Sequence, residues 1–188
     1  MTSSIEEKEN ETKEGVHLIA FVVEDRPGVM ARVTGLIRRR NFNITQISVA
    51  RTHIENYTRM TFVVQGDSRT LEQVIKQLRK QVEVLKVSEL KPETSVAREL
   101  ALVKVRSTDI TARNEIIQYI NIFRGTIIDV SPSSLICEVT GDSKKIDAFL
   151  KLLGPFGIIE VARTGTTALV RGAEASPKIP ETPYIEYT

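Results

Sequence analysis

The sequence predicts an α+β chain in which a β-α-β-β-α-β module occurs twice, because three patterns recur in both halves. The segment Gly66-Asp67-Ser68-Arg69 returns as Gly141-Asp142-Ser143-Lys144. Apolar residues alternate before each copy, as in a strand, and recur at helical spacing after it. They are Met60, Phe62, Val64, Leu71, Val74, Ile75 and Leu78 in the first half, and Leu135, Cys137, Val139, Ile146, Phe149, Leu150 and Leu153 in the second. A strand, a turn and an amphipathic helix therefore occur twice in register.

The first module is predicted over residues 15–90. Its strands are expected at 17–24, 44–52, 57–65 and 82–90, and its second helix at 68–79. The turn Asp25-Arg26-Pro27-Gly28 ends the first strand, because proline fixes φ and glycine accepts unusual backbone angles. A helix follows this turn, and Asn41 suits the left-handed position at its end.

The second module is predicted over residues 98–172, after a linker at 91–97. Strands are expected at 99–106, 126–130, 134–140 and 158–163, with a short edge strand at 166–170. One helix carries Ile116 and Ile120 and ends at Gly125, and the other spans 144–153. Both modules fit the ferredoxin-like split βαβ arrangement, so the expected fold is two tandem ferredoxin-like domains. Residues 1–14 are expected to be a disordered tail, and 173–188 a proline-rich tail that is mobile or extended.

The first strand is apolar on both faces. Leu18, Ala20 and Val22 alternate with Ile19, Phe21 and Val23. Helices cover only one face of the sheet in a split βαβ module, so the other face must meet water or protein. This pattern argues for a homodimer or a partner subunit on the open face.

Composition excludes several classes of function. The net charge of +2 creates no strong field for nucleic acid or an anionic membrane. The longest apolar run, 18–23, is too short to span a bilayer, and the N-terminus lacks a signal pattern. A single cysteine excludes an internal disulfide. We therefore expect a cytoplasmic protein that binds neither membranes nor nucleic acid.

The best candidate site is the turn from Asp25 to Gly28. Free N–H groups at a helix N-terminus favour a carboxylate or phosphate, and Gly28 permits close approach of a ligand. Asn43, at the start of the next strand, offers a donor and an acceptor, a combination that suits a free amino acid. The alternative is a plain turn in which Asp25 caps the helix. Alignment of the two halves places Thr111 and Thr126 at the positions of Gly28 and Asn43, so the site belongs to the first module alone.

Other conspicuous residues favour structural roles. Arg38-Arg39-Arg40 complements a helix C-terminus, and Cys137 shares its repeat position with Phe62 in the expected core. Neither His17 nor His53 has a partner at metal-ligand spacing. Phosphate-binding loops and the common catalytic motifs are absent from the sequence. The chain is therefore expected to have no catalytic residues and to bind no metal or cofactor itself.

Several segments resemble a known family. The run from Val23 to Val29, followed by Asn43-Ile44, resembles the amino-acid-binding ACT domain. Arg59-Met60-Thr61 in the first half, and Phe123-Arg124-Gly125 with 127–130 and 160–165 in the second, are similar to the small regulatory subunit of acetolactate synthase (acetohydroxyacid synthase). The resemblance covers about residues 16–172.

This resemblance implies a non-catalytic chain. The family's large catalytic subunit uses thiamine diphosphate, Mg²⁺ and FAD in the first common step toward valine, leucine and isoleucine. The small subunit activates it and confers feedback inhibition, usually by valine, which binds between the ACT domains of two small subunits. Carried over residue by residue, the implied effector site consists of Asp25, Arg26, Pro27, Gly28, Val29, Met30, Asn43 and Ile44. Many bacterial members have asparagine at the position of Asp25, so its carboxylate could pair with the effector's ammonium group, repel its carboxylate or cap the helix.

Two alternatives differ in class. One is a free-standing ACT-domain amino-acid sensor that acts on another enzyme or a transcription factor; the sequence contains no helix-turn-helix pattern for the latter. The other is an acylphosphatase-like enzyme, since that fold uses an arginine and an asparagine, here Arg26 and Asn43. The chain lacks the glycine-rich phosphate cradle that such an enzyme requires.

Overall fold

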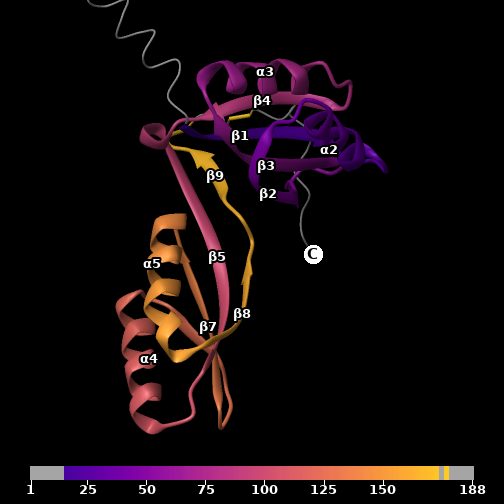
Figure 1. Cartoon of the computed structure of the whole chain (residues 1–188). Helices are drawn as coiled ribbons and strands as arrows, with labels where there is room; N and C mark the ends of the chain where they lie inside the picture. The colour runs from indigo at the N-terminus through magenta and orange to yellow at the C-terminus, as the bar shows by residue number, and fades with distance from the viewer. Residues whose placement is uncertain (1–14, 174–175, 178–188) are drawn as a thin grey trace, which may run out of the picture. The chain divides into compact units, whose positions relative to one another are not determined.

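The structure is a computed structural model that describes residues 15–173 and 176–177 (Figure 1). It divides into two compact units. Unit 1 comprises Met1–Val96 and Ala168–Thr188, and unit 2 comprises Ala97–Thr167. Residues 168–172, expected in the second domain, therefore group with unit 1. The predicted tail at 1–14 lies outside the described residues, as does most of the predicted tail at 173–188.

Unit 1 contains the first β-α-β-β-α-β module. Its elements are β1 (Gly15–Glu24), α2 (Val29–Arg39), β2 (Asn43–Arg51), β3 (Tyr57–Gly66), α3 (Ser68–Arg79) and β4 (Val84–Leu90). The sheet order is β2-β3-β1-β4, and all neighbours are antiparallel. The helix-facing residues of β1 and β3 form one core with α2 and α3. Phe21 and Phe62 meet edge to face at its centre, with ring centroids 4.8 Å apart.

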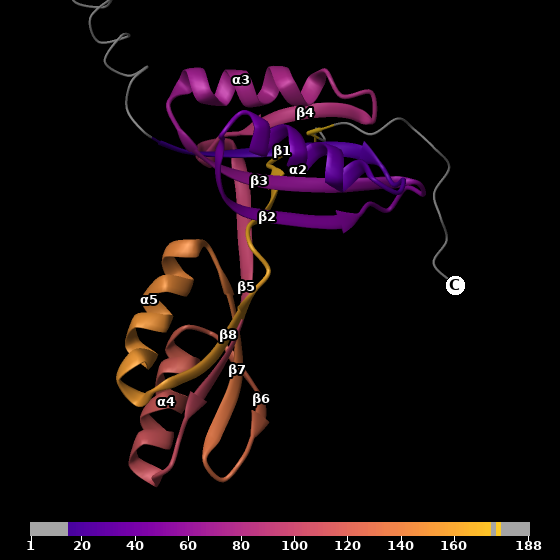
Figure 2. The same cartoon turned by 45° about the vertical axis from the view of Figure 1, so that its right-hand side comes forward.

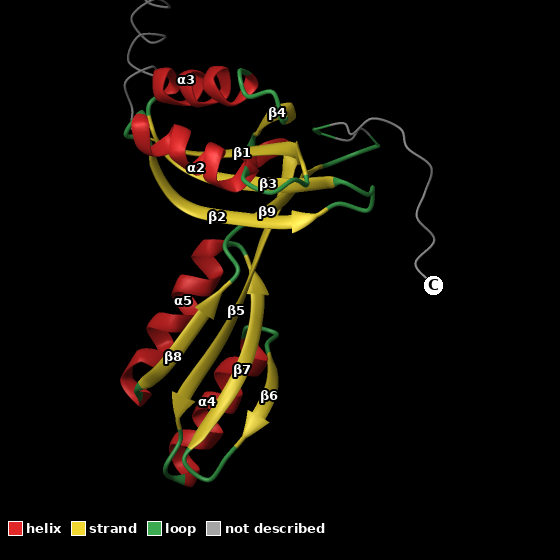
Figure 3. Ribbon diagram, turned by 90° about the vertical axis from the view of Figure 1, so that its right-hand side faces the viewer, coloured by secondary structure: helices red, strands yellow, loops and turns green. Residues whose placement is uncertain are grey.

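Unit 2 repeats the module. Its elements are β5 (Ser95–Arg106), α4 (Ile110–Ile122), β6 (Thr126–Val130), β7 (Ser134–Gly141), α5 (Ser143–Leu153) and β8 (Ile158–Arg163). The sheet order is β6-β7-β5-β8, and the short β9 (Thr167–Val170) pairs with β5. Figures 2 and 3 show α4 and α5 together on one face of this sheet. The predicted fold class, two tandem ferredoxin-like βαββαβ domains, is confirmed.

The predicted linker contains regular structure. A short 3-10 helix occupies Pro92–Thr94, and β5 begins at Ser95, four residues before the predicted strand. Alternation in the sequence is weak before Glu99, because the early part of β5 includes Arg98. The strand start is therefore set by its pairing partners rather than by local pattern.

Helix ends follow the backbone chemistry expected of them, with one difference. Asn41 has a φ of 55°, as predicted for the residue that ends α2. In unit 2 the left-handed residue is Arg124 (φ 53°) rather than Gly125. A Cβ on Gly125 would lie 2.7 Å from the Glu138 carbonyl oxygen. Glycine is needed at 125 for close approach to β7, and not for a left-handed φ.

Candidate functional site

Helix α2 begins without the side-chain cap that the other long helices have. Its N-cap is Gly28, and no side chain accepts a hydrogen bond from its first turn. In contrast, Asp67, Asp109 and Asp142 each cap a helix by accepting the backbone N–H of the residue three positions later. The Val29 N–H donates to the Arg26 carbonyl oxygen at 3.3 Å, while the rest of this first turn has no side-chain cap, and the helix dipole favours an anion there.

The backbone at Gly28 also leaves room for a ligand. Its φ of 86° is in the left-handed region, where glycine is favoured. A Cβ built on Gly28 would meet nothing within 4 Å, so the space beside this residue is open. Val29 is buried in the core and anchors the turn, while the Met30 side chain is exposed. Pro27, on the other side of Gly28, is exposed.

Asp25 does not cap α2. Its Oδ2 lies 2.9 Å from Arg51 Nε, at the end of β2, and its backbone N–H donates to the Asn56 carbonyl at 2.7 Å. Arg26 pairs instead with Glu24, at 3.0 Å. The alternative of Asp25 as a helix cap is therefore excluded. The Asp25 carboxylate, which replaces the asparagine of many family members, is paired with the Arg51 guanidinium. The sequence did not single out Arg51.

Arg51 could not be identified from the sequence, because only the tertiary structure brings it to the turn at residues 25–28. It is 26 residues from Asp25, and a lone arginine at a strand end has no distinctive pattern. The register of β2 with β3 and of β1 with β3 places Arg51 opposite Thr58 and Glu24 opposite Tyr57. The ends of β1 and β2 therefore meet at the same edge of the unit.

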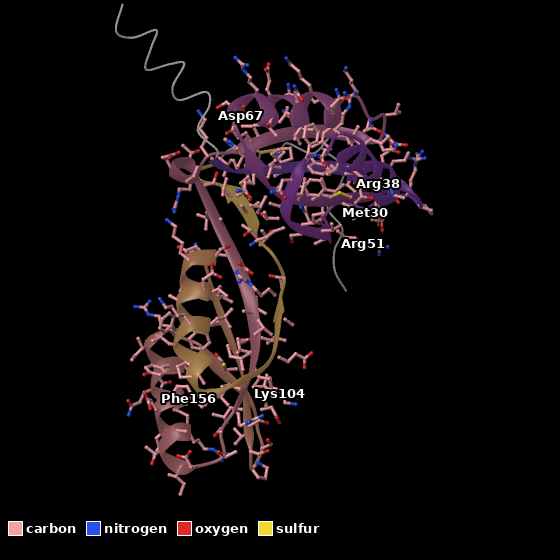
Figure 4. All side chains as sticks on the ribbon, in the orientation of Figure 1. Met30, Arg38, Arg51, Asp67, Lys104 and Phe156 are labelled. Carbon is pink, nitrogen blue, oxygen red and sulfur yellow. The ribbon has the colours of Figure 1, made fainter. Side chains whose placement is uncertain are left out.

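Asn43 and Ile44 lie at the other end of β2. Asn43 is opposite Gln65 and donates from Nδ2 to its Oε1 at 3.1 Å, while Ile44 packs against the core. β2 is nine residues long from Asn43 to Arg51, so about 26 Å separates the Cα atoms at its two ends. Figure 4 shows Arg51 and Asp67, which follows shortly after Gln65, on opposite sides of unit 1. One chain therefore brings together residues 25–30 but not Asn43 or Ile44.

The same separation bears on the enzyme alternative. Arg26 pairs with Glu24 at one end of the sheet, and Asn43 lies at the other, so a single chain does not assemble them as a catalytic pair.

Among residues 15–173 and 176–177, no three His, Cys, Asp or Glu side chains form a group that could hold a metal ion. Cys137 is buried, as predicted for a core residue, and burial raises the pKa of its thiol to about 11. No helix in this described part is long and apolar enough to cross a membrane.

Two ferredoxin-like βαββαβ modules in one chain are the architecture of tandem ACT-type domains. The model for an "AHAS small subunit-like ACT domain" matches residues 19–86, and that for the "small subunit of acetolactate synthase" matches residues 98–172. Together they cover most of the chain.

Whole-chain relatives agree with these matches. The probable acetolactate synthase small subunit of Methanothermobacter thermautotrophicus is 53% identical over 87% of this chain and 97% of its own length. The acetolactate synthase small subunit of Mycobacterium bovis is 47% identical over 83% of this chain and 92% of its own. The crystal structure of the Thermotoga maritima small subunit aligns with a TM-score of 0.79 and 42% identity, covering 85% of this chain and 99% of that one.

This chain belongs to the acetolactate synthase small-subunit family. It is accordingly the regulatory and not the catalytic component, and its partner is a large catalytic subunit.

Proposed function

We propose that this chain raises the activity of the acetolactate synthase large subunit and makes it subject to feedback inhibition by valine or another branched-chain amino acid. The observation that carries the proposal is the uncapped N-terminus of α2, beside open space at Gly28. The corresponding helix of unit 2, α4, is capped by Asp109. Of these two corresponding helices, therefore, only α2 begins without a side-chain cap.

The effector site in this proposal is shared by two copies of the chain. The effector's carboxylate lies at the uncapped start of α2, near Gly28 and Val29, and the partner subunit's Asn43 binds the polar end of the effector. The distance between the two ends of β2 supports this arrangement, because a small amino acid cannot span about 26 Å. The proposed site is incomplete without the second copy, which makes a homodimer through the ACT domains part of the mechanism.

Feedback then requires that the bound effector favours a dimer geometry that supports the large subunit less well. A coupling free energy of about 1–3 kcal/mol between effector and large-subunit binding is sufficient for ordinary allosteric control. In this proposal thiamine diphosphate, Mg²⁺ and FAD are held by the large subunit, and the complex works in the cytoplasm. This chain contributes affinity for the effector and for the large subunit.

The test is reconstitution with the large subunit from the same source, assayed with and without valine. Addition of the chain should raise the rate, and valine should then lower it. Gly28→Asp fills the open space and adds a negative charge at the carboxylate position, so valine affinity should fall more than about tenfold, or 1.4 kcal/mol.

Gly157→Asp is the matched control for this variant. Gly157 also has a left-handed φ, 90°, and space for a Cβ, but it lies in unit 2. Both substitutions place an aspartate at a left-handed φ, but Gly157 is outside the proposed site, so valine affinity should be unchanged in this control. If the chain binds valine but leaves the large subunit's rate unaltered, the free-standing sensor is the better account; if Gly28→Asp binds valine normally, the site is misplaced.

A further inference from the structure

The centre of the unit 1 sheet face that turns away from the helices is buried within a single chain. On β1 and β3, Ala20 is paired with Thr61 and Val22 with Arg59, and all four belong to this face because their neighbours point into the helix-covered core. A two-layer module leaves such a face without helix cover. Nevertheless Ala20 and Val22 are 0% exposed and Thr61 is 2% exposed.

The described part of the C-terminus supplies contacts on this face. We define the C-terminal strap as residues 168–173 and 176–177. Arg59 Nη2 donates to the Ala168 carbonyl oxygen at 2.8 Å and to that of Ser176 at 3.2 Å. Ala168 and Pro177 are buried, and the strap groups with unit 1 (Figure 3). A further bond, from Arg171 N–H to the Thr94 carbonyl at 2.8 Å, joins the strap to the short 3-10 helix at the end of the first stretch of unit 1.

Arg59 binds the strap through main-chain atoms. Its two acceptors are both backbone carbonyls, and its Nε is buried without a hydrogen-bond partner in the described structure. Burial without a compensating anion lowers the pKa of this guanidinium. An arginine that engages backbone carbonyls recognises an extended segment largely independently of its side chains. Small residues such as Ala168 then allow the segment to lie close to the sheet.

We propose that this face is a peptide-binding surface, and that its occupant is the chain's own C-terminal strap, with Arg59 as the positioning residue. The burial of Ala20, Val22 and Thr61 and the two carbonyls on Arg59 favour this occupant over a second copy. The open apolar face that the sequence offers to a dimer is thus closed in cis. The C-terminal segment acts as part of the first module.

Thiol labelling of the folded full-length chain tests the proposal. Thr61→Cys places a thiol of similar size on the covered face. The one native thiol, Cys137, is buried and has a raised pKa, so it contributes little background. The engineered thiol should react slowly in the full-length chain and in a chain ending at Pro177. It should react at least about tenfold faster in a chain ending at Thr167, which lacks the whole strap, and in the Arg59→Met background.

Controls separate loss of the strap from loss of the fold. Arg79→Met removes an exposed arginine from α3 and should leave labelling slow. A synthetic peptide of residues 168–188, but not its scrambled form, should restore slow labelling to the chain ending at Thr167, which a general loss of folding would prevent. Ala20→Cys is a second probe of the same face. Equal rates in the full-length and shortened chains would overturn the proposal, and protection that disappears on dilution would assign the face to a second copy.

Discussion

At the scale of single residues, unit 2 depends on a buried ion pair. Glu99 is 2% exposed and accepts hydrogen bonds from Arg163 Nε, from Arg163 Nη2 at 2.9 Å and from Ser143 Oγ at 3.0 Å. Arg163 Nη1 also donates to Asp147, at 2.7 Å. These hydrogen bonds hold the pKa of Glu99 below its ordinary value of 4.5, and the largest contribution comes from Arg163. A buried carboxylate with these donors joins β5, β8 and α5.

Replacing this carboxylate should destabilise the protein in a pH-dependent way. Glu99→Gln should lower the free energy of unfolding by about 1.5–3 kcal/mol at pH 7, because charged hydrogen bonds are lost. Since the folded-state pKa is depressed, Glu99 stabilises the fold above pH 4.5, and this stabilisation is lost as the pH falls through the folded-state value. Urea unfolding at pH 7 and at successively lower pH should show the two proteins converging. A difference that is independent of pH would contradict this assignment.

The Asp25–Arg51 pair should contribute little to stability. Both side chains reach solvent, with 37% of Asp25 and 86% of Arg51 exposed, so the ion pair is weak. Asp25→Asn should change the free energy of unfolding by less than about 0.5 kcal/mol, as measured by urea denaturation. Any change in valine affinity for this variant then reports on the site and not on folding. A loss of stability well above this value would show that Asp25 holds the turn.

At the scale of elements, several boundaries could be predicted from local sequence signals. The bounds of α3 and of strands β6 and β8 agree with the sequence prediction residue for residue. Asp67 and Asp142 follow glycines and cap α3 and α5, so the Gly-Asp turn marks both a strand end and a helix start. Local chemistry of this kind can be read along the chain.

The cap on α5 provides a direct test. Asp142 accepts from Lys145 N–H at 2.8 Å. Asp142→Ala should lower the free energy of unfolding by about 1 kcal/mol, while Asp142→Asn should retain most of the stability because asparagine also caps helices. Chemical denaturation of the three proteins side by side measures the difference. Equal losses in the two variants would indicate that the charge, and not the cap, is what matters.

Long-range contacts could not be predicted from sequence. The pairing of Arg51 with Asp25, the start of β5 at Ser95 and the strap carbonyls on Arg59 all join residues that no local pattern connects. The same holds for the candidate site. The turn at Gly28 was identified from its glycine and proline, but only the register of β2 shows that Asn43 lies at the far end of the sheet.

At the scale of the whole molecule, the central claim is that the effector is held between two copies. Within one chain, Gly28 lies near the Arg51 end of β2, whereas Asn43 is at its other end. Each proposed site therefore takes Gly28 from one copy and Asn43 from the other. Gly28→Asp and Asn43→Ala should each, on its own, lower valine affinity more than about tenfold. In a mixed dimer, however, both defects fall in one site and the other site is intact.

Titration with valine after unfolding and refolding an equal mixture of the Gly28→Asp and Asn43→Ala proteins tests this claim most directly. Random pairing makes half of the dimers mixed, so the mixture should recover about a quarter of the wild-type binding capacity, with wild-type affinity. A mixture that binds no more valine than the separate variants would contradict a site shared between two copies.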